Sequence, residues 1–113
     1  MSEVSLLHRA AHVLEDKKGE GIVAIDLRDV SIPTSYFLIV EADNPVHAKA
    51  LVTALREALP ERPAHTEGLN ERRWIILDYG DVVIHVFERE ARSFYDIDSL
   101  WADHIVPLAG ASV

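Results

Sequence analysis

The segment from Arg73 to Phe87 constrains the fold more strongly than any other part of this 113-residue chain. It consists of two runs rich in β-branched and aromatic residues, separated by a short segment that contains Gly80-Asp81. Two such runs on either side of a glycine turn are typical of a β-hairpin. A rigid hairpin suits the docking of a cationic partner better than it suits catalysis, because it presents rings and carboxylates at a fixed spacing. The residues expected at or near its tip are Asp78, Tyr79, Gly80 and Asp81, with Trp74 on the first arm.

The rest of the chain alternates between helical and extended patterns. Apolar residues at helical spacing predict three helices, and short apolar runs predict strands covered on both faces. Asn44 and Pro45 are expected to start the second helix as its cap and first residue. The expected helices are residues 2–18, with Ser2 as the cap, 45–58 and 93–104. The expected strands are residues 22–27, 36–40, a short piece at 64–67, and the two arms of the hairpin.

This order of elements predicts an α/β fold with a mixed sheet of about five strands. A length of 113 residues predicts one domain, residues 1–113, with a core of about residues 6–104 and a tail at 105–113 that is expected to fray from Pro107 onward.

The charge of the chain limits its partners. Nineteen acidic and 11 basic residues give a net charge of −8, and the adjacent basic pairs are few and scattered. Binding a nucleic-acid backbone requires clustered Lys and Arg, so a basic protein is the better electrostatic match. The chain has no cysteine, no export signal and no apolar run of about 20 residues, and we therefore expect a cytoplasmic protein that is not in a membrane.

A metal site is one alternative that the sequence raises. His8, His12 and Asp16 are four residues apart and share one face of the expected first helix, a spacing that can chelate a divalent ion. No further ligand can be named for such a site. A solvated helix face is therefore the preferred interpretation, and no bound metal is predicted.

An enzyme is the second alternative. Carboxylates cluster at residues 26–29 and 96–98, which resembles the acidic sites of metal-dependent nucleotidyltransferases. Such enzymes also need a phosphate cradle, and Gly19-Glu20-Gly21 has no Ser, Thr or Lys to complete one. His85 alternates with apolar residues in the hairpin and is expected to be satisfied in the sheet or at an interface, since no nucleophile can be assigned to it. The sequence therefore predicts neither catalysis nor a cofactor.

Several blocks of the chain resemble the ribosomal silencing factors, also called Iojap-like proteins. The resemblance extends from about Leu6 to Asp103, and the 15-residue hairpin block is its most specific part. Two positions depart from the family pattern: Ser35 replaces an acid, and residues 41–45 replace a small polar loop. The blocks that carry the resemblance are residues 24–28, 36–40, 68–69, 73–87 and 92–103.

The resemblance implies a three-layer αβα protein with a nucleotidyltransferase-like topology that lacks the catalytic residues. It implies a homodimer that binds the large-subunit ribosomal protein uL14 at the intersubunit face. Occupying that face blocks joining with the small subunit and represses translation. Carried over to this chain, the implied docking residues are Trp74, Asp78, Tyr79, Gly80 and Asp81.

Overall fold

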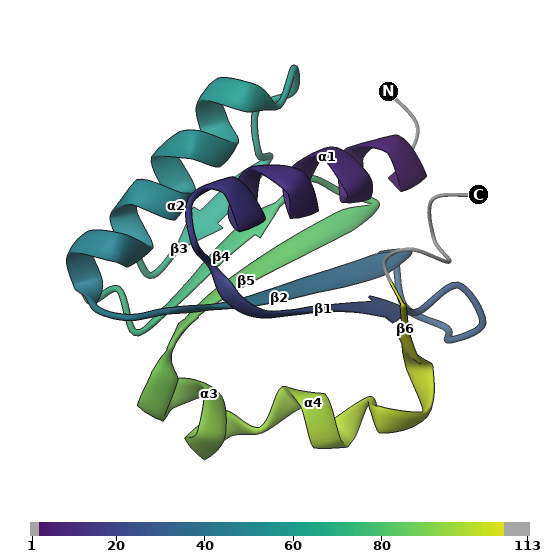
Figure 1. Cartoon of the computed structure of the whole chain (residues 1–113). Helices are drawn as coiled ribbons and strands as arrows, with labels where there is room; N and C mark the ends of the chain where they lie inside the picture. The colour runs from purple at the N-terminus through teal and green to yellow at the C-terminus, as the bar shows by residue number, and fades with distance from the viewer. Residues whose placement is uncertain (1–2, 108–113) are drawn as a thin grey trace.

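The computed structural model describes residues 3–107, which form a six-stranded mixed sheet with helices on both of its faces (Figure 1). The strands lie in the order β3-β4-β5-β2-β1-β6. Their bounds are β1 Glu20–Asp26, β2 Tyr36–Ala42, β3 His65–Glu67, β4 Trp74–Asp78, β5 Val82–Glu88 and β6 Ile105–Val106. The helices are α1 Glu3–Asp16, α2 Pro45–Ala58, α3 Arg89–Tyr95, α4 Ile97–Leu100 and the 3-10 turn η1 Ala102–His104.

The predicted hairpin is confirmed as the antiparallel pair β4–β5, in which Trp74 lies opposite Phe87. Its loop is closed by a hydrogen bond of 2.9 Å from the Tyr79 amide to the Val82 carbonyl. Gly80 has a φ of +89°, in the left-handed region that glycine adopts without strain.

The centre of the sheet is the parallel pair β2–β5, which the crossover through α2 makes possible. The start of α2 agrees with the prediction, since Asn44 Oδ1 accepts a hydrogen bond of 2.8 Å from the His47 amide and Pro45 follows it. β2 and β5 are mostly buried, as expected for strands covered on both faces.

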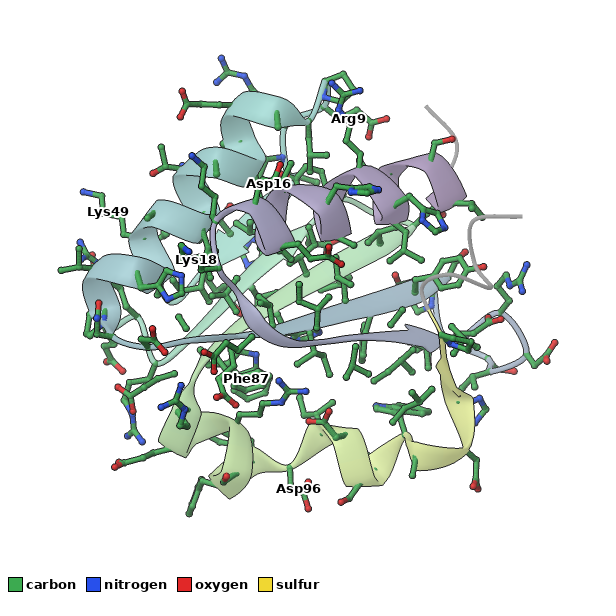
Figure 2. The ribbon with its side chains drawn as sticks, in the orientation of Figure 1. Arg9, Asp16, Lys18, Lys49, Phe87 and Asp96 are labelled. Atoms are coloured by element: carbon green, nitrogen blue, oxygen red, sulfur yellow. The ribbon has the colours of Figure 1, made fainter. Side chains whose placement is uncertain are left out.

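Each face of the sheet has its own hydrophobic cluster. The larger cluster lies between the sheet and helices α1 and α2, and the smaller one lies between the sheet and α3 and α4 (Figure 1). Figure 2 shows Phe87 in the second of these layers. The three-layer αβα class is thereby confirmed, with six strands where about five were expected.

The C-terminal part of the fold differs from the prediction. The expected helix at residues 93–104 begins earlier, at Arg89, and is interrupted at Asp96, which has a left-handed φ of +48°. Ile105 and Val106 were expected in the tail, outside the core, but they pair with Ile25 and Ala24 as β6. The predicted cap Ser2 and residues 108–113 lie outside the described part of the chain. Within residues 3–107, no helix combines the length and apolar character needed to cross a lipid bilayer.

Candidate functional site

The β4–β5 hairpin divides its side chains between the two faces of the sheet. Successive residues of a strand point to opposite sides, so Trp74, Ile76 and Asp78 share the α3–α4 face. Ile75 and Leu77 point the other way and are buried in the α1–α2 cluster. Among the described residues, Trp74 is the only member of β4 in the α3–α4 cluster, and Ile76 and Asp78 beyond it are half-buried. This leaves the tip half of β4 uncovered on one face.

Trp74 lies where this uncovered strip meets helix α3. Its ring stacks on Phe87 at 5.0 Å between centroids and lies 4.7 Å from the ring of Tyr95. The indole Nε1 donates a hydrogen bond of 3.0 Å to Nδ1 of His85. The side chain is half-buried, so it is held by its neighbours and still reaches the surface.

The expectation that Tyr79 presents its phenol at the hairpin tip is wrong. Only 8% of the residue is exposed, because alternation past Asp78 turns it toward the α1–α2 cluster. Burial raises the pKa of its phenol above the usual value. Its hydroxyl has no hydrogen-bond partner among the described residues. Tyr79 therefore packs on the α1–α2 side of the hairpin, whereas Trp74 lies on the α3–α4 side.

The remaining tip residues, Asp78, Gly80 and Asp81, carry two carboxylates. Asp81 and Gly80 are exposed, and Asp78 Oδ1 accepts a hydrogen bond of 2.8 Å from the Gly80 amide. On the neighbouring strand, Glu67 lies opposite Ile76, so its carboxylate is on the same face. This arrangement places the carboxylates of Glu67 and Asp78 beside Ile76, with the exposed Asp81 in the adjoining turn. We call Trp74, Ile76, Asp78, Gly80 and Asp81 the hairpin surface.

The tip is also fixed to the body of the protein. The carbonyl of Asp81 accepts hydrogen bonds from the amides of Ser35 and Tyr36, at 2.9 and 3.0 Å. Because both donors lie at the start of the central strand β2, the tip cannot move independently of the sheet.

His85 lies beneath Trp74 and is 5% exposed. Burial lowers the pKa of its imidazole to about 4, so the ring is neutral at pH 7. An indole N–H only donates, which means that Nδ1 of His85 is the acceptor and the ring proton resides on Nε2. Nε2 has no hydrogen-bond partner among the described residues. The prediction that His85 is satisfied within the sheet therefore holds for one of its two nitrogens.

The low pKa of His85 predicts a loss of stability in mild acid. Its folded pKa of about 4 lies below the usual value of 6.5, so protonation favours the unfolded chain. The free energy of unfolding should fall by about 3 kcal/mol between pH 6.5 and pH 4 from this residue alone. Urea denaturation across this range, compared with His85→Phe, isolates the effect. A difference between the two proteins that stays constant with pH would contradict it.

In each of the two acidic clusters that raised the enzyme alternative, one aspartate forms an ion pair with an arginine. Asp26 pairs with Arg28 at 2.7 Å, and hydrogen bonds from Arg28 lower the pKa of the Asp26 carboxyl. Asp98 pairs with Arg92 at 2.9 Å, and Asp96 occupies the break between α3 and α4. Residues 3–107 contain no group of three or more His, Asp or Glu side chains arranged to hold a metal ion, the residues around His8 and His12 included.

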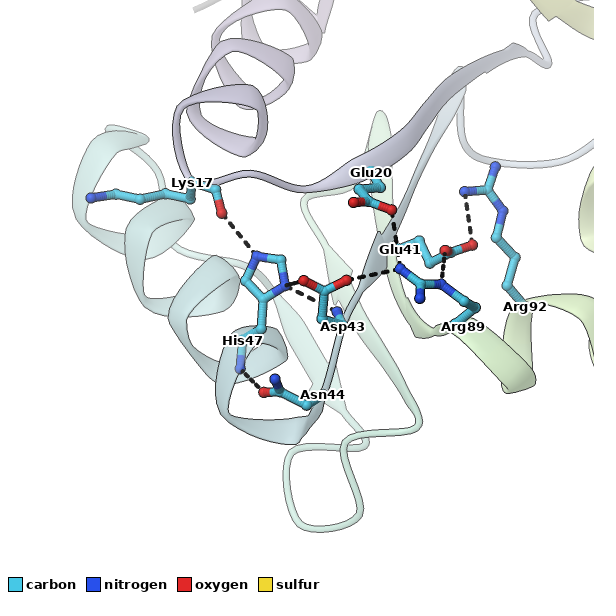
Figure 3. Close-up of polar contacts among 8 residues, drawn as sticks. All are labelled: Lys17, Glu20, Glu41, Asp43, Asn44, His47, Arg89 and Arg92. Atoms are coloured by element: carbon cyan, nitrogen blue, oxygen red, sulfur yellow. Dashed lines mark hydrogen bonds and ion pairs between the residues drawn. The ribbon is translucent and has the colours of Figure 1, made fainter.

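The atypical segment at residues 41–45 has a structural role that the sequence did not predict (Figure 3). Arg89 at the start of α3 pairs with Glu41 at 2.8 Å, Asp43 at 2.8 Å and Glu20 at 3.1 Å. The hydrogen bond to Glu41 and the charges of the three carboxylates raise the pKa of Arg89 above its usual value. The network ties helix α3 to the ends of β1 and β2, but it is exposed, and exposed ion pairs contribute little to stability.

The break at Asp96 also exposes apolar side chains that a continuous helix would have placed on one stripe. Phe94 and Leu100 are 78% and 73% exposed, whereas Ile97 and Trp101 pack into the α3–α4 cluster. The sequence did not indicate which of these four apolar side chains would be exposed, because the break in the helix depends on the left-handed backbone of one residue, Asp96.

Comparison with known proteins places these features in a family. A family model described as "Ribosomal silencing factor during starvation" matches residues 1–111. A protein of Bacillus subtilis named "Ribosomal silencing factor RsfS" is 36% identical over 112 residues, which cover 96% of this chain and 93% of that protein. A protein of the same name from Halalkalibacterium halodurans is 33% identical over 106 residues, 91% of each chain. A crystal structure of a Chromobacterium violaceum protein superposes with a TM-score of 0.85 at 28% identity, covering 90% of this chain and 88% of that one.

Proposed function

This chain belongs to the ribosomal silencing factor family, and from that premise we propose that it represses translation by binding the large ribosomal subunit and blocking its joining with the small one. Family membership supports a ribosome-associated role in the regulation of translation. The finer proposal is that the chain acts as a single cytoplasmic domain and that its partner on the large subunit is the ribosomal protein uL14.

The observation that carries this proposal is the hairpin surface with Trp74 at its centre. Partly buried tryptophans fixed by their neighbours are the side chains that most often dominate the energy of protein interfaces. The indole is held by Phe87, Tyr95 and His85, so little conformational entropy is lost when a partner covers it. Ile76 extends the apolar contact along the strand toward the tip.

The charge around this surface matches a ribosomal protein. Glu67 and Asp78 lie beside the apolar strip, Asp81 is exposed in the adjoining turn, and the whole chain carries a net charge of −8. Ribosomal proteins are basic, so opposite charges speed their encounter with this chain and orient it. The same charge opposes binding to ribosomal RNA, which favours a protein partner over a nucleic-acid one.

Steric occlusion requires no chemical step. A protein bound at the intersubunit face of the large subunit occupies the space that the small subunit needs, and repression lasts as long as binding does. We therefore propose that the chain acts without catalysis, cofactor or metal.

Self-association is a separate part of the proposal. Phe94 and Leu100, on the consecutive helices α3 and α4, present large apolar side chains to solvent that a second copy of the chain could cover. We propose that the protein is a homodimer, which sedimentation of the purified chain over a range of concentrations tests directly.

Binding to isolated uL14, measured by calorimetry, tests the choice of partner. We expect a complex whose affinity falls as salt rises from 50 to 500 mM, because exposed charges are screened. A basic ribosomal protein from the opposite side of the large subunit serves as the control. Equal affinity for both proteins would contradict a specific partner.

The enzyme alternative is tested separately by thermal denaturation. A rise in the melting temperature of this chain when nucleotide and Mg²⁺ are added would support it.

A further inference from the structure

We propose that His85 is a positioning residue that fixes the orientation in which Trp74 meets its partner. This inference rests on the proposed function, because it concerns the same hairpin surface. It assigns a role to the acceptor nitrogen of this buried imidazole, beyond the packing of its ring.

The contact between the two side chains is directional. Trp74 Nε1 lies 3.0 Å from His85 Nδ1, and the ring planes are inclined by 37°. Because His85 is buried, the indole edge that carries Nε1 faces the sheet. The opposite, wholly apolar edge of Trp74 is then the one available to a partner.

The imidazole of His85 is itself fixed by the residues packed around it. Its strand neighbours are Ile39 on β2 and Ile76 on β4. The ring of Phe37 meets it edge-on at 4.6 Å, and the ring of Phe87 stacks parallel to it at 6.2 Å. Burial between these two rings restricts the imidazole and aims its acceptor nitrogen at the indole of Trp74.

The hydrogen bond has two consequences for docking. A tryptophan ring rotated by half a turn about its second side-chain torsion would present Nε1 to the partner, and the bond to His85 opposes that orientation. It also supplies the indole N–H with an acceptor before a partner covers the ring, so that binding does not bury an unpaired donor. The low pKa that burial gives His85 keeps Nδ1 available as an acceptor at pH 7.

Two substitutions separate positioning from packing. His85→Phe keeps a ring against Phe37 and Phe87 but has no acceptor. His85→Asn loses the ring, yet its Oδ1 is attached at the same place as Nδ1 and can accept from Trp74. Positioning predicts that His85→Phe weakens binding to large subunits about tenfold, which corresponds to one lost hydrogen bond of about 1.4 kcal/mol, and that His85→Asn stays within about threefold of wild type.

A merely structural role predicts the reverse order, with His85→Asn the weaker binder because it leaves a void in the cluster. The second readout is the indole N–H resonance of Trp74, recorded by NMR with Trp101→Phe as the background. We expect this proton to exchange rapidly with solvent in His85→Phe and slowly in wild type and His85→Asn.

The outcomes for the ribosome and for His85 are distinguishable. Wild-type protein that fails to bind large subunits overturns the proposed function, whatever the indole resonance shows. Wild-type binding that His85→Phe retains in full, with an unchanged indole resonance, overturns the positioning role alone.

Discussion

Replacing Trp74 by alanine should weaken binding to the large ribosomal subunit by roughly 30-fold or more. Interface tryptophans of this kind contribute about 2 kcal/mol or more, and 1.4 kcal/mol corresponds to a factor of ten in affinity. The indole is the largest apolar group of the hairpin surface, so its removal leaves Ile76 as the main apolar contact. Co-sedimentation of labelled protein with purified large subunits measures the change.

This substitution also affects stability and therefore needs a control. The ring of Trp74 contacts Phe87 and Tyr95, so its truncation should lower the free energy of unfolding by about 2–3 kcal/mol without preventing folding. Val46→Ala is the matched control, because Val46 is an exposed apolar residue on α2, across the sheet from Trp74. Wild-type affinity in a folded Trp74→Ala protein, or an equal loss in Val46→Ala, would show that the hairpin surface is wrongly assigned.

Replacing Gly68 by alanine should destabilise the protein by about 2–5 kcal/mol. Gly68 has a φ of +84°, which costs a residue with a side chain about 1–2 kcal/mol. A Cβ at this position would lie 2.0 Å from the carbonyl oxygen of Trp74, so the backbone of β4 must also shift. Forced shifts of this kind cost a further 1–3 kcal/mol. Urea denaturation gives the difference from wild type.

Gly80→Ala is the matched control for this prediction. Gly80 has a similar φ of +89°, but apart from its two chain neighbours no described residue has an atom within 4 Å of the position its Cβ would occupy. It should therefore show only the conformational cost of about 1–2 kcal/mol. Equal destabilisation by the two substitutions would mean that the close approach to the Trp74 carbonyl has no energetic weight.

Much of the fold follows from local sequence signals. The hairpin and the start of α2 were predicted because a glycine turn between β-branched runs, and an Asn-Pro pair before an apolar stripe, act within a few residues. The break at Asp96 and the strand β6 were missed for the opposite reason. A left-handed residue is not required by the sequence there, and β6 exists only because β1 offers an edge to pair with.

The candidate site was predicted in part for similar reasons. The hairpin correctly brings Trp74 and Asp78 to one face, since both occupy alternate positions of one strand. Tyr79 was misplaced because its direction depends on whether the strand alternation continues into the loop. The bond from Trp74 to His85 links residues 11 positions apart and requires the register of the hairpin, in which Ile76 lies opposite His85.

Subunit joining is the most direct measure of the central claim, that the hairpin surface silences ribosomes by occupying the intersubunit face. Purified large and small subunits are mixed at a magnesium concentration that favours joining and are resolved on a sucrose gradient. Excess wild-type protein should keep the large subunits separate from the small ones and should migrate with the large subunits. The same amount of Trp74→Ala should allow the subunits to join and should remain at the top of the gradient. Full joining in the presence of bound wild-type protein would contradict the claim.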